Sequence, residues 1–171
     1  MCGIVGYIGS QNAQDFVMDG LEKLEYRGYD SAGIAVNTGE SNLSVIKRKG
    51  RLQNLSNALK EYPLNGTMAI GHTRWATHGK PSDENSHPHY NKDKSLVVVH
   101  NGITENYLEL KRELISKGYE FSSETDTEVV AHFLSELYNG DLLEATKKLL
   151  TIIKGAYALG IMSVNEPDRL I

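Results

Sequence analysis

The spacing of apolar residues changes period along the chain and predicts strands at both ends, with helices between them. Near-continuous apolar runs bounded by glycine and polar residues are typical of buried strands, and 95–100 is the clearest of these. A β-branched, glycine-spaced run at 2–8 also predicts a buried strand. The predicted strands cover 2–8, 33–37, 43–49, 67–73, 95–100 and 155–163, and one more begins at 169–171.

Apolar residues three and four positions apart predict helices in the intervening segments. Leu52, Leu55 and Leu59 share one stripe, and the sequence from Thr125 to Glu128 matches a capping box before an apolar-periodic run. The polar segments 25–33 and 80–93 are predicted to be loops. The predicted helices cover 13–24, 52–62, 104–117, 128–138 and 141–153.

This order of elements favours layered sheets flanked by helices, an α+β fold, over an alternating Rossmann array. The sequence has no internal repeat and no linker, so we expect one domain over 1–171. Because the chain stops at Ile171 inside a predicted strand, we expect it to be cut from a longer polypeptide.

Composition places the chain among ordinary globular proteins, with 40% apolar and 23% charged residues among 171. A formal charge of −4 excludes the basic surface typical of nucleic-acid binding. No apolar run is long enough for a membrane span or a secretory signal. From the charge we expect no nucleic-acid partner, and from the short apolar runs no membrane partner. One cysteine permits no intramolecular disulfide and no Cys-rich zinc site, and favours a cytoplasmic location.

The single cysteine is Cys2, directly after Met1. Its small side chain leads us to expect removal of Met1, after which the chain begins with both a thiol and a free α-amine. A thiol with a pKa of about 8.5 is mostly protonated at neutral pH, and an α-amine that titrates near 7.7–8.0 is a suitable adjacent base. One residue then supplies the nucleophile and the base. The alternative is a structural thiol at the start of a buried strand, and position alone does not decide between them.

A nucleophile of this kind needs donors for an oxyanion. Asn101 and Gly102 follow a predicted buried strand and offer a side-chain amide and a backbone N–H. Asn-Gly is also the commonest turn dipeptide, so a strand-ending turn is the alternative.

Two charged residues have the chemistry to hold an amino acid by its opposite ends. Arg74 can bind a carboxylate bidentately, with a surface arginine stacked on Trp75 as the alternative. Asp126 can accept an ammonium group, with an ordinary first-turn helix residue as the alternative. Arg27, in a glycine-rich loop, buttresses the site or lies at the surface.

The histidines raise the question of a metal, since His87 and His89 flank Pro88. The pair lacks a third ligand at a defined spacing, so we favour hydrogen-bonded loop anchors and expect no metal.

Five motifs, in order along nearly the whole chain, resemble the glutaminase domain of the class II glutamine amidotransferases, which are N-terminal-nucleophile (Ntn) hydrolases. Within that family, YRGYDSAG and RWATHG favour the branch that forms glucosamine 6-phosphate from fructose 6-phosphate over the amidophosphoribosyltransferases. The motifs are MCGIVGYIG, LEYRGYDSAGIAV, GHTRWATHG with HPH after it, VVHNGITENY and SETDTEV.

The resemblance implies a role for each candidate residue. Cys2 is the nucleophile, and Asn101 and Gly102 form the oxyanion hole. Arg74 binds the carboxylate of L-glutamine and Asp126 its α-amine. The resemblance also assigns supporting roles: Trp75, Thr77, His78 and Gly79 line the pocket or belong to a mobile loop over it, Arg27 orients the N-terminus, and His87 ties down the loop 80–93.

The resemblance further implies a four-layer αββα sandwich of two antiparallel sheets, incomplete at its C-terminus, with no cofactor. The sugar-phosphate isomerase domains that bind fructose 6-phosphate are absent, and a homodimer is expected through those missing domains. Two alternatives stay open. The same glutaminase can feed another acceptor, such as phosphoribosyl pyrophosphate, or the chain can be a non-catalytic glutamine-binding module.

Overall fold

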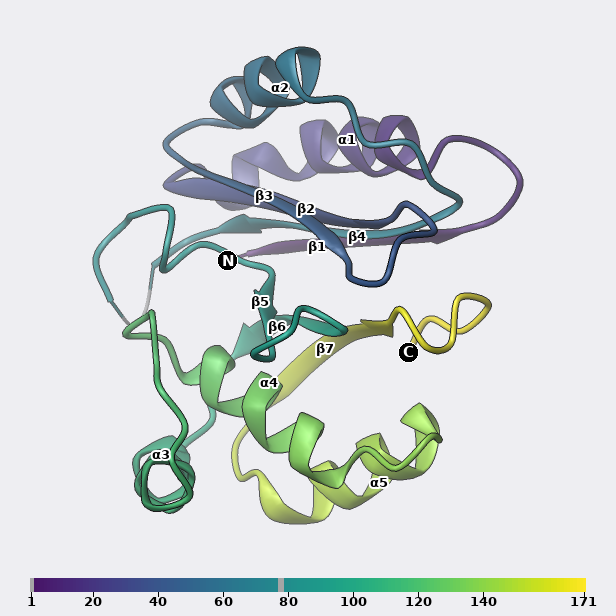
Figure 1. Ribbon diagram of the computed structural model, residues 1–171. Coiled ribbons are helices and arrows are strands. Elements are labelled where there is room, and N and C mark those ends of the chain that lie inside the picture. The colour runs from purple at the N-terminus through teal and green to yellow at the C-terminus, as the bar shows by residue number, and fades with distance from the viewer. Residues whose placement is uncertain (1, 77–78) are drawn as a thin grey trace.

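The computed structural model describes residues 2–76 and 79–171, and in it two antiparallel sheets are stacked between two layers of helices (Figure 1). Helices α1 and α2 cover the outer face of the first sheet, and α4 and α5 cover that of the second (Figure 1). The predicted αββα sandwich of class α+β is confirmed. The helices are α1 (Ala13–Leu24), α2 (Leu52–Glu61), α3 (Tyr107–Ser116), α4 (Asp126–Leu137) and α5 (Leu142–Ile152), with a short 3-10 helix η1 at Glu25–Arg27.

The first sheet has the strand order β1-β4-β2-β3. Its two inner strands, β4 and β2, are buried along their whole length, including the polar residues His72, Thr73 and Arg74 at the end of β4. The prediction of a fully buried strand at 2–8 is wrong, because β1 is an edge strand and is only partly covered, with Ile8 exposed. The strands are β1 (Gly3–Ile8), β4 (Met68–Arg74), β2 (Ser31–Asn37) and β3 (Ser44–Lys49).

The second sheet has the order β5-β6-β7. Strand β5 lies inside the predicted loop 80–93, where two residues are too few to show a period. The strand predicted at 169–171 begins as a single bridge between Leu170 and Met162. The strands are β5 (His89–Tyr90), β6 (Leu96–Gly102) and β7 (Tyr157–Ser163).

The start of α4 differs from the predicted capping box. The Thr125 hydroxyl accepts a hydrogen bond from the Glu128 N–H, as predicted (3.4 Å). The Glu128 carboxylate instead accepts from the backbone N–H groups of Ser122 (2.8 Å) and Ser123 (2.6 Å). These bonds fasten the first turn of α4, which carries Asp126, to the preceding segment.

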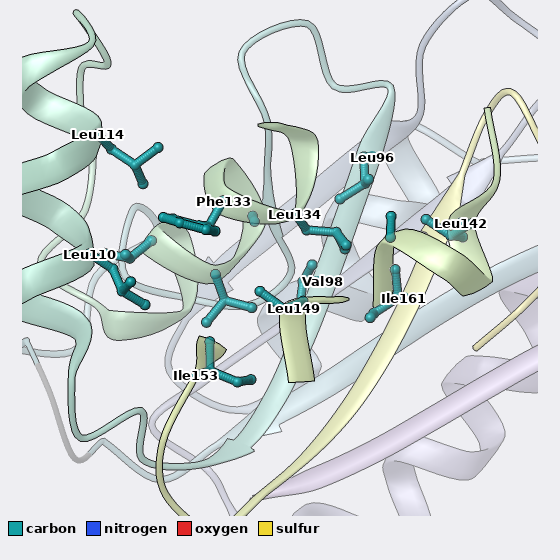
Figure 2. Packing of buried hydrophobic residues seen from close by; sticks show 14 residues of the cluster. Leu96, Val98, Leu110, Leu114, Phe133, Leu134, Leu142, Leu149, Ile153 and Ile161 are labelled. Atoms are coloured by element: carbon teal, nitrogen blue, oxygen red, sulfur yellow. The ribbon is translucent and has the colours of Figure 1, made fainter. Parts of the chain in front are cut away.

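Apolar side chains fill each of the three spaces between the four layers. In the outer space of the second sheet, Leu134 of α4 and Leu149 of α5 lie beside Val98 of β6 (Figure 2). Ile70 and Val99 belong to the cluster between the two sheets. Each fully buried leucine contributes about 1.5–3 kcal/mol. Among the helices of the described residues, none has the length and apolar character needed to cross a bilayer.

Candidate active site

A cavity of about 470 Å³ opens where β1, β4, β6 and α4 meet. Residues far apart in the sequence reach it because the two sheets bring the start of β1, the ends of β4 and β6, and the first turn of α4 together. The cavity is lined by Cys2, Arg27, Arg74, Trp75, His87, Asn101, Gly102 and Asp126 from the predicted set, and by His100, Ile103, Thr125 and Thr127.

Cys2 lies beside the end of β4 because β1 and β4 pair with Gly3 opposite Thr73. Its sulfur accepts a hydrogen bond from the backbone N–H of Trp75 (3.2 Å), and its thiol lies 3.6 Å from the Trp75 carbonyl. The Cys2 carbonyl accepts from Asn101 Nδ2 at 3.0 Å. The thiol is only partly buried, so it lies at the cavity wall and not in the core as the structural alternative requires.

Asn101 and Gly102 are the last residues of β6 and not a turn. Ile103 donates its N–H to the Ala156 carbonyl, so these two opposite residues form a hydrogen-bonded pair of the ladder. Hydrogen-bonded and non-hydrogen-bonded pairs alternate along an antiparallel ladder, so the neighbouring residue Gly102 belongs to a non-hydrogen-bonded pair. The Gly102 N–H is therefore turned away from β7 and toward the cavity. Gly102 has φ +131°, and a Cβ there would collide with the Ala156 carbonyl, so only glycine fits.

Arg74 ends β4 and is 3% exposed, which excludes the surface arginine. Its Nη2 donates to the Gly79 carbonyl at 3.1 Å. Burial lowers the pKa of the Arg74 guanidinium, while the nearby Asp30 and Asp126 act in the opposite direction. The Trp75 ring packs edge-on against Tyr29 (5.4 Å between centroids).

Asp126 is the first residue of α4 and is 4% exposed. Its Oδ2 accepts from the Thr104 N–H at 2.8 Å and lies 3.7 Å from His100 Nδ1. The carboxylate is thus held in a fixed position on the wall that faces the same cavity as Arg74. A single cavity with a buried cation, a buried anion and a thiol is complementary to an amino acid whose side chain reaches the sulfur.

Four buried histidines form a cluster at the cavity, and two of them, His87 and His100, line its wall. The rings of His72 and His87 stack at 4.2 Å, and the Thr127 hydroxyl bonds to His87 Nε2 (2.9 Å) and His100 Nδ1 (3.0 Å). Burial lowers the pKa of His72 to about 4 and takes those of His87 and His89 well below their usual value, so these rings are neutral. Across residues 2–76 and 79–171, no group of three His, Cys, Asp or Glu side chains is arranged to hold a metal ion.

Not every predicted residue lines the cavity. Among the described residues, Gly79 contributes its carbonyl to Arg74 and does not reach the cavity wall. Thr77 and His78, and also Met1, lie outside the described residues. His87 belongs to the predicted loop, and its Nε2 bonds to the Thr127 hydroxyl of α4.

The sequence analysis missed Asp30, which holds the segment after β4. The Asp30 N–H donates to the Arg74 carbonyl (3.2 Å), and its carboxylate accepts from the Ala76 N–H and the Ser31 hydroxyl (2.9 Å). Asp30 lies inside the motif YRGYDSAG, but nothing in its local pattern indicates a partner 44 to 46 positions away.

Residues 72–171 match a family model described as a glutamine amidotransferase domain. The chain belongs to this family. The match covers more than half of the sequence, including Arg74, Asn101, Gly102 and Asp126, and it confirms the resemblance drawn from the motifs.

Curated relatives extend the match over the whole chain. Glutamine–fructose-6-phosphate aminotransferase [isomerizing] of Clostridium acetobutylicum is 58% identical over 171 residues, which is 100% of this chain and 28% of the relative. The enzyme of the same name from Thermus thermophilus is 59% identical over 168 residues, again 28% of its length. The chain therefore spans less than a third of these relatives.

Solved structures of amidotransferases share the fold. Glutamine phosphoribosylpyrophosphate amidotransferase from B. subtilis superimposes with a TM-score of 0.81 at 32% identity, covering 96% of this chain and 35% of that one. A structure described as the allosteric regulatory enzyme of purine biosynthesis gives 0.83 at 32% identity, covering 96% and 36%. Both support the Ntn-type sandwich.

Proposed function

We propose that the chain is a glutaminase domain that hydrolyses the side-chain amide of L-glutamine to glutamate and ammonia. One observation carries this proposal: the Cys2 sulfur, two candidate oxyanion donors and an Arg–Asp pair line the same cavity. The domain extends over 1–171, and its chemistry requires no cofactor.

Glutamine is held by its amino-acid end. The Arg74 guanidinium binds the α-carboxylate and Asp126 the α-ammonium, each through charge-assisted hydrogen bonds that are strong in a buried setting. Both groups are already buried and positioned, so glutamine binds with little reorganisation of the site. The side-chain amide then extends toward Cys2.

The reaction is an acyl transfer through the sulfur of Cys2 once Met1 has been removed. The α-amine takes the thiol proton, and the thiolate attacks the carboxamide carbon. Asn101 Nδ2 and the Gly102 N–H stabilise the tetrahedral oxyanion, each worth about 2.7–4 kcal/mol. The protonated α-amine gives its proton to the departing ammonia, which leaves a thioester. Water, activated by the same amine, releases glutamate and restores the thiol.

The remaining candidates support this centre. Trp75 fixes the sulfur through its N–H. We assign Thr77, His78 and Gly79 either to the lining of the pocket or to a mobile loop over it, and in either place they keep water from bound glutamine. Arg27 orients the N-terminus, and His87 anchors the loop to α4.

We propose further that the ammonia serves the reaction named in the curated relatives. In a longer parent protein, sugar-phosphate isomerase domains bind fructose 6-phosphate and convert it with this ammonia to glucosamine 6-phosphate for amino-sugar synthesis. Such a parent is a homodimer through those domains and acts in the cytoplasm. The 32% identity to the phosphoribosylpyrophosphate enzyme favours a second candidate, the same glutaminase feeding that acceptor. Assaying the parent enzyme with fructose 6-phosphate and with phosphoribosylpyrophosphate as the ammonia acceptor distinguishes the two candidates.

Replacement of Cys2 tests the glutaminase. Cys2→Ala is expected to abolish glutamate release and to leave glutamine binding, measured by calorimetry. Lys60→Ala, on the exposed surface of α2, is the matched control and is expected to keep full activity. Glutamate release that survives Cys2→Ala refutes the nucleophile assignment, whereas an inactive wild-type chain that binds glutamine supports a binding module.

The state of the N-terminus needs a separate measurement. Cys2 is the only thiol, so a glutamine analogue with an electrophilic carbon in place of the amide labels one atom. Intact mass spectrometry then reports loss of Met1 and capture of the sulfur in one spectrum. Full activity with Met1 still attached contradicts the role of the α-amine.

A further inference from the structure

We propose that His72 is the positioning residue that sets which way the carboxamide of Asn101 faces, and thereby presents its N–H₂ group to the reaction. His72 lies in β4 of the first sheet and Asn101 at the end of β6 in the second, so the contact spans the two sheets. The inference rests on the proposed glutaminase function and assigns a role to a residue outside the cavity wall.

The hydrogen bonds determine the position of the ring proton. His72 Nε2 lies 3.1 Å from the His100 backbone carbonyl and 2.9 Å from Asn101 Oδ1. A backbone carbonyl only accepts, so Nε2 must carry the hydrogen. An Nε2–H group cannot face an amide N–H₂ group productively, so the Asn101 atom that meets it is the oxygen. The nitrogen of Asn101 then points the opposite way, toward the Cys2 carbonyl, where it donates at 3.0 Å.

The surroundings keep His72 in this one state. The ring is fully buried and stacked at 4.2 Å on His87, which restricts its rotation. Arg74, His87 and His100 are the groups near it that are or can become positive, and burial lowers its pKa to about 4. His72 therefore remains neutral, with one proton, and that proton is on Nε2.

Loss of this donor leaves only the bond to the Cys2 carbonyl to hold Asn101 in this amide orientation, so the flipped orientation becomes more populated. The flipped carboxamide presents an oxygen to the developing oxyanion and repels it. Because the amino-acid end of glutamine is held by Arg74 and Asp126, the defect falls on the chemical step and not on binding. Removing one oxyanion donor outright lowers kcat by about 10²–10³-fold, which sets the upper limit for a mispositioned one.

His72→Phe tests the role, because it keeps a flat ring and removes the donor. We expect kcat for glutamine hydrolysis to fall about 10–100-fold with KM within about twofold of wild type. His72→Gln, whose amide nitrogen reaches the place of Nε2, is expected to recover most of the loss, and His72→Asn, whose shorter side chain does not, is expected to recover little. His132→Phe is the matched control: it replaces another buried histidine, which lies between Tyr119 and Phe121, and is expected to retain kcat.

A second readout separates positioning from general damage. Alkylation of Cys2 by iodoacetamide builds no oxyanion, so its rate is expected to be unchanged in His72→Phe. Wild-type kcat in His72→Phe overturns the proposal, as does a loss shared equally by KM, alkylation and thermal stability. If the variant does not fold, ¹⁵N NMR of the wild-type ring decides: an Nδ1–H tautomer at neutral pH overturns it. Failure of the glutaminase itself shows separately, as activity that persists in Cys2→Ala.

Discussion

Three buried histidines are neutral in the folded chain. We therefore expect mild acid to destabilise the fold, already at pH values above those at which carboxylates titrate. Burial lowers the pKa of His72 to about 4, against opposing hydrogen bonds to Asn101 and His100. Burial also takes the pKa values of His87 and His89 well below 6.5, helped by positive neighbours that include Lys47 for His89.

The sign follows from proton uptake. Unfolded histidine titrates near pH 6.5, so below that pH the unfolded chain binds protons that the folded chain refuses. Above pH 6.5 both states are neutral and stability is at its plateau. As the pH falls from 6.5 toward 4, the free energy of unfolding decreases by about 1.4 kcal/mol per pH unit for each such group. His72 alone accounts for about 2 kcal/mol at pH 5, and His87 and His89 shift the free energy of unfolding in the same direction. Even the contribution of His72 alone is a sizeable part of the stability of a typical domain, which is about 5–15 kcal/mol.

Urea titrations at fixed ionic strength between pH 7.5 and 5.0 measure the effect. The fluorescence of Trp75, the only tryptophan, and far-UV circular dichroism give two independent signals. We expect a plateau above pH 7 and, toward pH 5, a free energy of unfolding that falls with a slope set by net proton uptake on unfolding. His72→Gln is expected to lower that slope by one proton, whatever its own stability. Equal stability at pH 7 and pH 5 would refute the reasoning, since it would mean that the folded chain protonates these rings readily.

Four substitutions test the core and the site. Leu134→Ala, in the fully buried core, is expected to lose about 2–5 kcal/mol in urea titrations, and an equal loss in the exposed Leu108→Ala would contradict the packing argument. Arg74→Lys cannot form a bidentate contact and is expected to raise KM for glutamine at least tenfold, with a smaller change in kcat. An unchanged affinity for glutamine would contradict the role of Arg74 in binding the carboxylate. Asp126→Asn keeps an oxygen for the Thr104 N–H and is expected to weaken glutamine binding while melting normally. Gly102→Ala is expected to lower kcat because its Cβ displaces the strand end, and normal turnover would exclude the Gly102 donor.

The spacing of apolar residues was enough to predict those elements whose buried face is marked by a regular apolar repeat. Helix α1 has the predicted bounds, Ala13–Leu24, because Val17 and Leu21 recur at helical spacing on its buried face. Helix α3 begins three residues later than predicted, at Tyr107. The preceding Thr104 N–H bonds to Asp126, a partner 22 positions away that no local pattern indicates. Strand β5 has two residues and exists only because β6 lies beside it, so no local pattern predicts it.

The candidate site divides in the same way. Cys2, Arg74 and Asp126 were predicted from their residue types, because a thiol can act as a nucleophile, a guanidinium can bind a carboxylate and a carboxylate can bind an ammonium group. The contact between His72 and Asn101 joins residues 29 positions apart on different sheets. From the sequence we expected hydrogen-bonded loop anchors among the histidines, and no partner was predicted for His72. Hydrogen bonds of this kind depend on how the two sheets stack, and the stacking produces no repeating pattern in the sequence from which the partners could be predicted.

The stacking of the sheets is therefore part of the catalytic geometry. The first sheet carries the sulfur and the guanidinium, and the second carries the two candidate oxyanion donors. Between them lie Ile70 and Val99, whose cluster fixes the spacing of the sheets, and the hydrogen bond from His72 to Asn101, which fixes the orientation of one donor. An oxyanion donor acts only within a few tenths of an ångström of its best distance. Because close-packed interiors transmit strain, a change in this apolar layer moves the donors relative to the nucleophile and reaches the chemical step without touching a residue of the cavity.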